Sequence, residues 1–265
     1  MSRLCVGLVL ATLAIALPAS AAPPPTKSPG ELLVGLNLGE PGFQVGAVQG
    51  TKVVLARGFE IDLARLLARK LELERVRFVH EPAFRKLYAP GAKEWDIALA
   101  QVTITPTRAK AVSFSRPYLT ADQGVLLAEG VAAPKRLGEL RPLQLCAQRG
   151  TTSAATIAER VRPKRKPILF EKQEGLLDAL YQRRCDAVVN DAPLLAAFRA
   201  AAPDRYGQLI GRLGVDAGYG VVVEKGSPLT KRVSRALAEL EREGKTPFLV
   251  KRWLDVDVSK LPVLG

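Results

Sequence analysis

The sequence predicts an α/β fold in which mainly parallel sheets are flanked by helices, and two observations carry this prediction. Short apolar runs that suit buried strands alternate with segments whose apolar residues recur at helical spacing. The same alternation starts again in the second half of the chain. Because strands that alternate with helices usually pair in parallel, we expect two such α/β units.

The first unit begins with an apolar run suited to a strand at residues 32–36. A helix follows, because Phe59, Leu63 and Leu67 recur at helical spacing with charged residues on the opposite side. We then expect a strand, a short helix and a third strand at residues 76–79, 83–88 and 97–100.

The second unit repeats the pattern, with a strand at residues 143–147 and a helix at 152–161. A strand at 168–170, a helical stripe from Leu176 to Tyr181 and a strand at 187–190 complete it. The remaining chain supplies elements that could close either unit, namely a strand at 219–223 and helices around 233–240 and 248–253.

The N-terminus has the layout of a secretory signal peptide. Arg3 precedes an apolar stretch at residues 4–17, and the small residues Ala19, Ser20 and Ala21 follow. We expect residues 1–21 to be removed by cleavage near Ala21, and residues 22–30 to form a Pro-rich leader. The mature protein is expected to be periplasmic or extracellular.

The formal net charge of +13 raises the question of a nucleic-acid partner. However, the cations are scattered, and the densest cluster, residues 160–166, is interrupted by Pro163. Aromatic residues that would stack on bases are missing from this cluster. We therefore expect no nucleic-acid partner.

The mature chain contains two cysteines, Cys146 and Cys185. In an oxidising compartment they could form a disulfide, and they could equally be two small buried apolar residues. The single histidine, His80, has no partner at ligand spacing, so we expect no metal and no cofactor.

Motifs of several enzyme classes are missing from the sequence. There is no phosphate-binding Walker loop, no dinucleotide fingerprint before a helix and no Gly-x-Ser-x-Gly elbow. With a single histidine in the sequence, a catalytic Ser-His or Cys-His pair is also disfavoured. These absences disfavour nucleotide chemistry and hydrolysis.

Polar residues gather where the predicted strands end, which is where open parallel sheets bind ligands. Arg108 follows Thr103 and Thr105, and a guanidinium suits a carboxylate. Residues 148–152, from Gln148 to Thr152, could bind an anion or cap a helix. Asp191 could pair with an ammonium group or cap the following helix. Together these residues form the parts of a clamp for a zwitterion.

The chain resembles bacterial extracellular solute-binding family 3, the amino-acid-binding proteins of ABC importers. Motifs along nearly the whole mature chain carry this resemblance: Gly58-Phe59-Glu60-Ile61-Asp62-Leu63-Ala64, Trp95-Asp96-Ile97-Ala98, Phe114-Ser115-Arg116-Pro117-Tyr118, Gln148-Arg149-Gly150-Thr151-Thr152, Cys185-Asp186-Ala187-Val188-Val189-Asn190-Asp191 and Tyr219-Gly220-Val221-Val222-Val223.

The resemblance implies a two-lobed, type II periplasmic-binding-protein-like fold with a ligand cleft between the lobes. Lobe 1 would comprise residues 31–119 and 219–265, and lobe 2 residues 120–218. Hinge closure around a ligand would then bring the two lobes together.

The same resemblance implies roles for residues in the cleft. Arg108 and Thr151 would bind the α-carboxylate, while Thr103 and Asp191 would receive the α-ammonium. The ligand side chain would face Asn37, Glu40 and Phe84. Glu40 and Asn37 favour a polar or cationic side chain, whereas Arg149 and Arg57 could reach an acidic one, so the ligand's side chain stays open.

By resemblance the protein is a non-enzymatic, monomeric receptor that delivers a free amino acid to an ABC-importer permease. Two alternatives use the same fold. One is a periplasmic dehydratase of the cyclohexadienyl or arogenate type, with Glu40 as general acid. The other is an amino-acid sensor module.

Overall fold

The computed structural model describes residues 24–214, 217–254 and 258–265. The expected signal peptide at residues 1–21, with its cleavage site, lies outside the described residues. Within the described ranges, no helix has the length and apolar content needed to cross a membrane.

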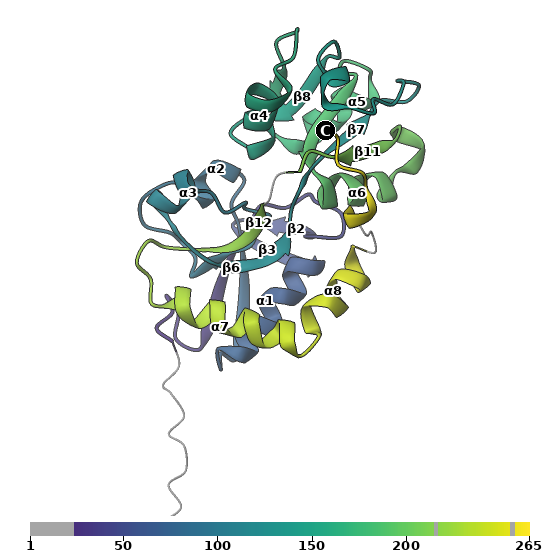
Figure 1. Cartoon of the computed structure of the whole chain (residues 1–265). Helices are drawn as coiled ribbons and strands as arrows, with labels where there is room; N and C mark the ends of the chain where they lie inside the picture. Colours follow the sequence, from purple (N-terminus) through teal and green to yellow (C-terminus); the bar gives the residue numbers. More distant parts are fainter. Residues whose placement is uncertain (1–23, 215–216, 255–257) are drawn as a thin grey trace, which may run out of the picture.

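The described residues form two sheets, each in its own lobe (Figure 1). The sheet of lobe 1 has seven strands in the order β2-β3-β4-β1-β5-β12-β6. Their bounds are β1 Glu31–Leu36, β2 Val45–Gln49, β3 Lys52–Arg57, β4 Arg75–His80, β5 Ile97–Ala98, β6 Ser113–Thr120 and β12 Gly218–Val223. The sheet of lobe 2 has five described strands in the order β11-β7-β10-β8-β9. Their bounds are β7 Gln123–Leu127, β8 Leu145–Gln148, β9 Ile168–Phe170, β10 Ala187–Asp191 and β11 Leu209–Arg212.

Both sheets combine parallel and antiparallel pairs. The predicted parallel pairing is present where β1 joins β4 and β5, and where β8 joins β9 and β10. The strands that lead into and out of lobe 2 are antiparallel to their neighbours, as β12 is to β5 and β6, and β7 is to β10 and β11. The sequence pattern did not indicate β6, β7 or β11.

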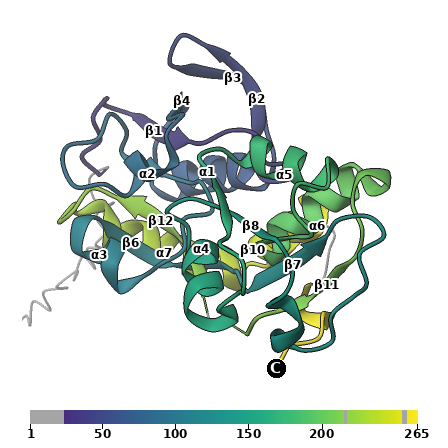
Figure 2. The same ribbon diagram turned by 90° about the horizontal axis from the view of Figure 1, so that it is seen from above.

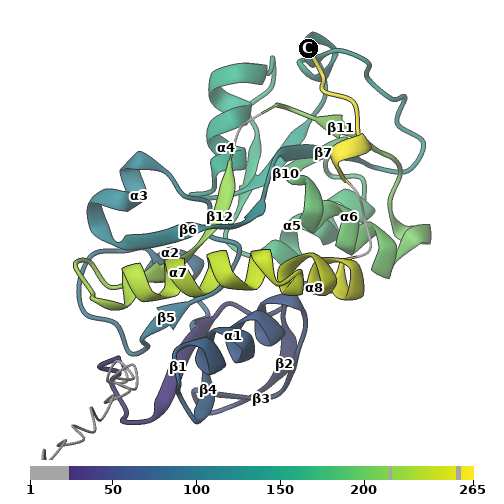
Figure 3. The ribbon, with the colours of Figure 1, turned by 60° about the horizontal axis from the view of Figure 1, so that its bottom comes forward.

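Helices cover the faces of both sheets. In lobe 1, α1 (Phe59–Lys70), α7 (Leu229–Arg242) and α8 (Lys245–Trp253) share one apolar core with the sheet (Figure 3). In lobe 2, α4 (Thr152–Thr156), continued by the π-helical turn η2 (Ile157–Val161), packs on one face, while α5 (Gln173–Tyr181) and α6 (Ala192–Ala201) pack on the other. Two short helices, α2 (Phe84–Leu87) and α3 (Pro106–Ala111), lie on the cleft side of lobe 1.

Two of the connections between the lobes lie side by side. The chain leaves lobe 1 after β6 and returns between β11 and β12. The Ala121 amide donates to the Ala217 carbonyl at 2.8 Å, and the Leu213 amide donates to the Gln123 carbonyl at 2.7 Å. Such a pair of backbone connections is the place where one lobe can rotate against the other.

The C-terminal residues end on lobe 2 (Figure 1). We assigned residues 219–265 to lobe 1, and α7 and α8 do pack there. Leu264, however, is buried in the core of lobe 2, and its amide donates to the Arg212 carbonyl at 2.8 Å. The short segment carries no periodic pattern that would indicate this packing.

A β-hairpin spans residues 45–57, where the sequence analysis predicts no strand. Strands β2 and β3 pair through a tight turn at Gly50, whose φ of +62° favours glycine. The hairpin projects from the rest of lobe 1 (Figure 2). Leu55 on this hairpin is 82% exposed. The alternation of buried and exposed residues is weak here, so the pattern did not predict strands.

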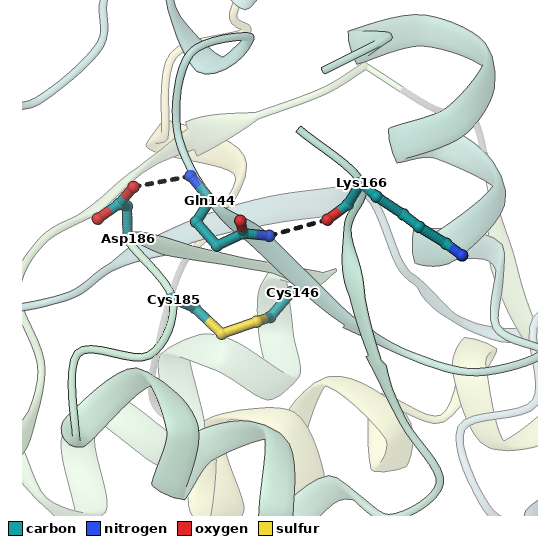
Figure 4. The surroundings of a disulfide bond; sticks show 5 residues. All are labelled: Gln144, Cys146, Lys166, Cys185 and Asp186. Carbon is teal, nitrogen blue, oxygen red and sulfur yellow. Dashed lines mark hydrogen bonds between the residues drawn. A yellow bond between two sulfur atoms is a disulfide. The ribbon is translucent and has the colours of Figure 1, made fainter. Parts of the chain in front are cut away.

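Cys146 and Cys185 form a disulfide within lobe 2 (Figure 4). Cys146 belongs to β8, and Cys185 lies just before β10. Next to the disulfide, the Asp186 carboxylate accepts from the backbone amide of Gln144 at 2.7 Å. Of the two alternatives that the sequence left open, the structure contains the disulfide.

Replacing both cysteines with alanine is expected to destabilise lobe 2. The disulfide closes a sequence separation of 39 residues, for which the chain-entropy relation gives a contribution of about 4 kcal/mol. We expect Cys146→Ala/Cys185→Ala to lower the melting temperature by roughly 5–15 °C. Reductant should lower the wild-type midpoint similarly and leave the variant unchanged. Equal midpoints for wild type and variant would show that the disulfide adds no stability.

Candidate functional site

A cavity lies between the two lobes and is lined by polar side chains from both. Eight of the nine ligand-binding residues predicted from the sequence line it, and only Thr105 does not. The lining residues are Asn37, Glu40, Phe84, Ala100, Gln101, Thr103, Arg108, Gln148, Thr151, Thr152, Gln173, Asn190, Asp191 and Leu194.

This inner cavity adjoins a larger outer one. The inner cavity holds about 30 Å³, which is room for roughly one or two water molecules. The outer cavity holds about 560 Å³ and shares five lining residues with the inner one: Asn37, Glu40, Phe84, Gln148 and Gln173. The lobes therefore lie close together at the inner end of the cleft.

Arg108 is positioned by a short helix that begins at the end of a polar loop. Thr105 caps this helix, α3, because its hydroxyl accepts from the Arg108 amide at 3.2 Å, and Pro106 takes the first helical position. The Thr105 side chain therefore fixes the backbone that carries Arg108. This placement explains why Thr105 does not line the cavity.

The Arg108 guanidinium is buried, with an exposed fraction of 7%. It stacks on the ring of Tyr88 at 4.3 Å and lies 5.7 Å from the ring centre of Phe84. It donates to the Thr103 carbonyl at 2.9 Å and to the Gly150 carbonyl at 3.4 Å. Within the described part of the chain it forms no ion pair, and burial lowers its pKa.

Tyr88 and Arg108 also connect the two lobes. The Tyr88 hydroxyl, in lobe 1, donates to the Gly150 carbonyl of lobe 2 at 3.0 Å. Gly150 adopts a φ of +76°, which favours glycine, and an added Cβ there would lie 3.2 Å from Arg85. The close approach of the lobes at this point thus depends on the absence of a side chain.

Asp191 ends β10 and faces the cavity from lobe 2. It stands at the start of α6 but makes no side-chain cap there. Its carboxylate instead accepts from the Tyr219 hydroxyl at 2.8 Å and from the Gln123 side chain. Burial raises the pKa of Asp191 to about 6, while these two hydrogen bonds and the Arg108 charge act in the opposite direction.

The segment from Gln148 to Thr152 places its side chains along the lobe 2 wall. The Thr151 hydroxyl accepts from the Ala154 amide at 3.3 Å, which caps α4, and donates to the Gln148 carbonyl at 2.7 Å. Gln148 donates to the Glu171 carbonyl at 3.1 Å. The capping role that the sequence suggested for Thr151 is therefore present, and its side chain borders the cavity as well.

Glu40 and Asn37 line the lobe 1 side of both cavities. Glu40 is 6% exposed, and its Oε2 atom has no hydrogen-bond partner. The pKa of Glu40 is well above its usual value. Burial is the largest cause, and the nearby carboxylate of Glu60 is the second. Asn37 donates to the Glu81 carbonyl at 2.8 Å.

Glu60 forms a buried polar network close to the cavity. Its carboxylate accepts from the backbone amide of Gln101 at 2.9 Å, from the side-chain amide of Gln44 at 3.0 Å and from the Tyr118 hydroxyl. Burial raises the pKa of Glu60 to about 7, and the Tyr118 and Gln101 hydrogen bonds oppose this rise. The network ties α1 to β6, one of the strands that lead to lobe 2.

Several residues of the site were missed by the sequence analysis. Gln173 and Asn190 line the cavity, while Tyr88 and Tyr219 orient Arg108 and Asp191. Tyr88, Asn190 and Tyr219 lie within predicted elements, whereas Gln173 precedes the helical stripe predicted from Leu176. The partners of all four come from distant segments. No local pattern marks such pairs.

The two arginines considered for an acidic ligand side chain lie elsewhere. Arg149 borders the outer cavity and is paired with Glu171 at 2.5 Å. Arg57 is exposed on the hairpin and lines neither cavity. Across the described ranges, no cluster of three or more His, Cys, Asp or Glu side chains could hold a metal ion.

Comparisons with known proteins agree with this architecture. Residues 34–256 match the model of the family "Bacterial extracellular solute-binding proteins, family 3". The glutamine-binding protein of an ABC transporter in Bacillus subtilis is 29% identical over 77% of this chain and 74% of its own.

Solved structures give the same result. An ancestral arginine-binding protein bound to arginine is 29% identical, with a TM-score of 0.72 over 84% of this chain and 98% of its own. An ancestral amino-acid-binding protein described as a precursor of cyclohexadienyl dehydratase is 30% identical, with a TM-score of 0.71 over 85% of this chain and 95% of its own. With its two lobes and the family match over most of its length, this chain belongs to the bacterial extracellular solute-binding proteins of family 3.

Proposed function

We propose that this protein is the extracytoplasmic receptor of an ABC importer and that it binds a free amino acid between its lobes. The observation that carries the proposal is the placement of a buried guanidinium and a buried carboxylate, Arg108 and Asp191, in one cavity between the lobes. An α-amino acid presents the complementary pair of charges on two groups bonded to the same carbon atom.

Arg108 would bind the α-carboxylate. A buried charge is costly without a counterion, and the described contacts of Arg108 are to neutral carbonyls and rings. A carboxylate would supply the missing charge through two parallel hydrogen bonds to the planar guanidinium. Thr151, across the cavity, would border the same carboxylate.

Asp191 would bind the α-ammonium, together with Thr103. Two neutral donors, Tyr219 and Gln123, already hold the Asp191 carboxylate. Burial raises the pKa of this carboxylate, and the charge of Arg108 opposes the rise without forming an ion pair among the described residues. An ammonium group would therefore add a favourable ionic interaction at this position.

Binding would require hinge motion, which we infer from the size of the inner cavity. About 30 Å³ is too small for an amino acid, and the groups of the clamp come from both lobes. The ligand would thus enter when the lobes are apart and favour their closure. A permease that recognises the closed form could then distinguish the loaded receptor from the empty one.

The comparisons support this proposal. The relative and the two solved structures described above are named as binding proteins for glutamine, arginine or amino acids in general, and the first of them belongs to an ABC transporter. We infer from these names an amino-acid ligand, a permease partner and a place outside the cytoplasm. We also infer binding without catalysis, because the cleft groups would together form a clamp for a zwitterion.

Replacing Arg108 with alanine is expected to abolish ligand binding. Charge-assisted hydrogen bonds contribute about 1.5–3 kcal/mol each, so the loss of two should weaken binding by at least about 100-fold. The amino acids are screened by thermal shift, where a ligand at 100 times its Kd raises stability by about 2.7 kcal/mol, or roughly 5–10 °C. The Arg108→Ala variant should show no shift.

Arg136→Ala is the matched control, since Arg136 is an exposed arginine that lines neither cavity. It should retain the full thermal shift. If no amino acid shifts the melting temperature of folded wild-type protein, the receptor proposal fails. Turnover of prephenate or arogenate by that protein would then support the dehydratase alternative.

Ligand affinity is expected to fall as the pH falls through the pKa of Asp191. Protonation removes the charge that the ammonium needs, so a pKa of about 6 predicts a roughly tenfold rise in Kd from pH 7 to pH 5. Asp191→Asn should bind more weakly at pH 7 and lose most of this dependence, as measured by calorimetry.

The stability of the empty protein should change in the opposite direction. The folded-state pKa of about 6 exceeds the ordinary aspartate pKa of 3.8, so the folded protein takes up this proton first as the pH falls. The contribution of Asp191 to stability therefore increases from pH 7 towards pH 4.

For the ligand, an affinity that is constant between pH 5 and 7 would contradict the assignment of Asp191.

A further inference from the structure

Two buried polar atoms without partners belong to residues that line the same end of the cleft. Among the described residues, Glu40 Oε2 and Gln173 Nε2 are the fully buried, unpartnered side-chain atoms whose residues line the inner cavity. Glu40 comes from lobe 1, between β1 and β2, and Gln173 opens α5 of lobe 2. A buried polar atom without a partner loses free energy, so a group that satisfies both atoms would be stabilised there.

The two lobes nearly touch beside these atoms. Gly39, next to Glu40, lies close to Glu174, next to Gln173, since a Cβ added to Gly39 would be 3.4 Å from the Glu174 carboxylate. Both Glu40 and Gln173 line the inner and the outer cavity. A ligand whose α-groups occupy the clamp would therefore extend its side chain between them.

The hydrogen-bonding direction of Gln173 follows from a backbone amide. The Asp191 amide can only donate, and it donates to Asn190 Oδ1 at 2.8 Å. Asn190 Nδ2 is therefore the end that donates to Gln173 Oε1 at 3.0 Å. This chain of bonds leaves Nε2 of the cavity-lining Gln173 as a buried donor without an acceptor.

Glu40 supplies the opposite function. Its Oε2 atom is an acceptor in the ionised carboxylate, and a protonated carboxyl still retains acceptor capacity. The subsite thus offers one acceptor from lobe 1 and one donor from lobe 2. We propose that this subsite selects an amino acid whose side chain ends in a carboxamide, with its NH₂ on Glu40 and its C=O on Gln173.

Other side-chain ends match the subsite less completely. A guanidinium or ammonium has donors only, so it leaves Gln173 Nε2 without an acceptor. A carboxylate has acceptors only and meets the same carboxylates, Glu60 and Glu174, that raise the pKa of Glu40. An apolar side chain leaves both atoms unpaired.

The charged groups around the outer cavity are balanced. Apart from the single histidine, His80, three acids and three cationic side chains line it, namely Glu40, Glu171, Glu174, Arg85, Arg149 and Lys172. One of these pairs, Arg149 and Glu171, is already formed. No net charge therefore favours a charged side chain over a neutral one, and hydrogen-bond matching decides the preference.

This inference rests on the proposed receptor function and is tested by calorimetry with L-glutamine, L-asparagine, L-arginine and L-glutamate. We expect one of the two carboxamides to bind at least about tenfold more tightly than either charged amino acid. Gln173→Met keeps the side-chain length and removes the Nε2 donor together with the acceptor of Asn190, so it should weaken carboxamide binding by about 10- to 100-fold. Arginine binding should change by less than about threefold.

Two further variants complete the test. Gln182→Met is the matched control, because Gln182 lies exposed just beyond the other end of α5, and it should leave every affinity unchanged. Glu40→Gln keeps an acceptor and removes the carboxylate. It should preserve carboxamide binding within about fivefold and weaken arginine binding.

The outcomes separate this inference from the proposed function. If arginine or glutamate binds at least as tightly as the carboxamides, and Arg108→Ala abolishes that binding, the receptor stands and the carboxamide subsite is overturned. The subsite is also overturned if Gln173→Met weakens all four ligands equally. If no amino acid binds to the folded protein, both proposals fail.

Discussion

The burial of the Arg108 guanidinium is the constraint on which the cleft depends. A cation in this position needs aromatic faces, carbonyl acceptors and a fixed backbone, and the chain supplies them from Tyr88, Thr103 and the Thr105 cap. The Gly150 carbonyl from the opposite lobe belongs to the same set. The group that would bind a ligand anion therefore also contributes to holding the lobes together.

The hinge and the site share residues as well. Tyr219 belongs to β12, which returns from lobe 2, and its hydroxyl holds Asp191. Gln123 begins β7, which enters lobe 2, and it holds the same carboxylate. A rotation at the connecting strands would thus alter the hydrogen bonds of Asp191 directly. The binding of a charged ligand group to Asp191 would therefore depend on the relative position of the lobes.

Much of this architecture follows from local sequence patterns, because strands and helices with one apolar face leave a periodic signal. The polar ends of the strands near Arg108, Thr151 and Asp191 were predicted for the same reason. Gln173 was not, because its importance arises from Asn190, 17 residues away, and from Glu40 across the cleft. Antiparallel strands β6 and β7 were missed too, since their pairing partners lie far along the chain.

The crossing of the C-terminal residues to lobe 2 gives the molecule a useful asymmetry. The first described residues are fixed to lobe 1, where the Lys27 amide donates to Asp96 at 2.7 Å. The last residue is fixed to lobe 2, where its carbonyl accepts from the Leu137 amide at 3.0 Å. Fluorescent proteins fused to the two ends would therefore be attached to different lobes. Energy transfer between them would report lobe movement without any label inside the cleft.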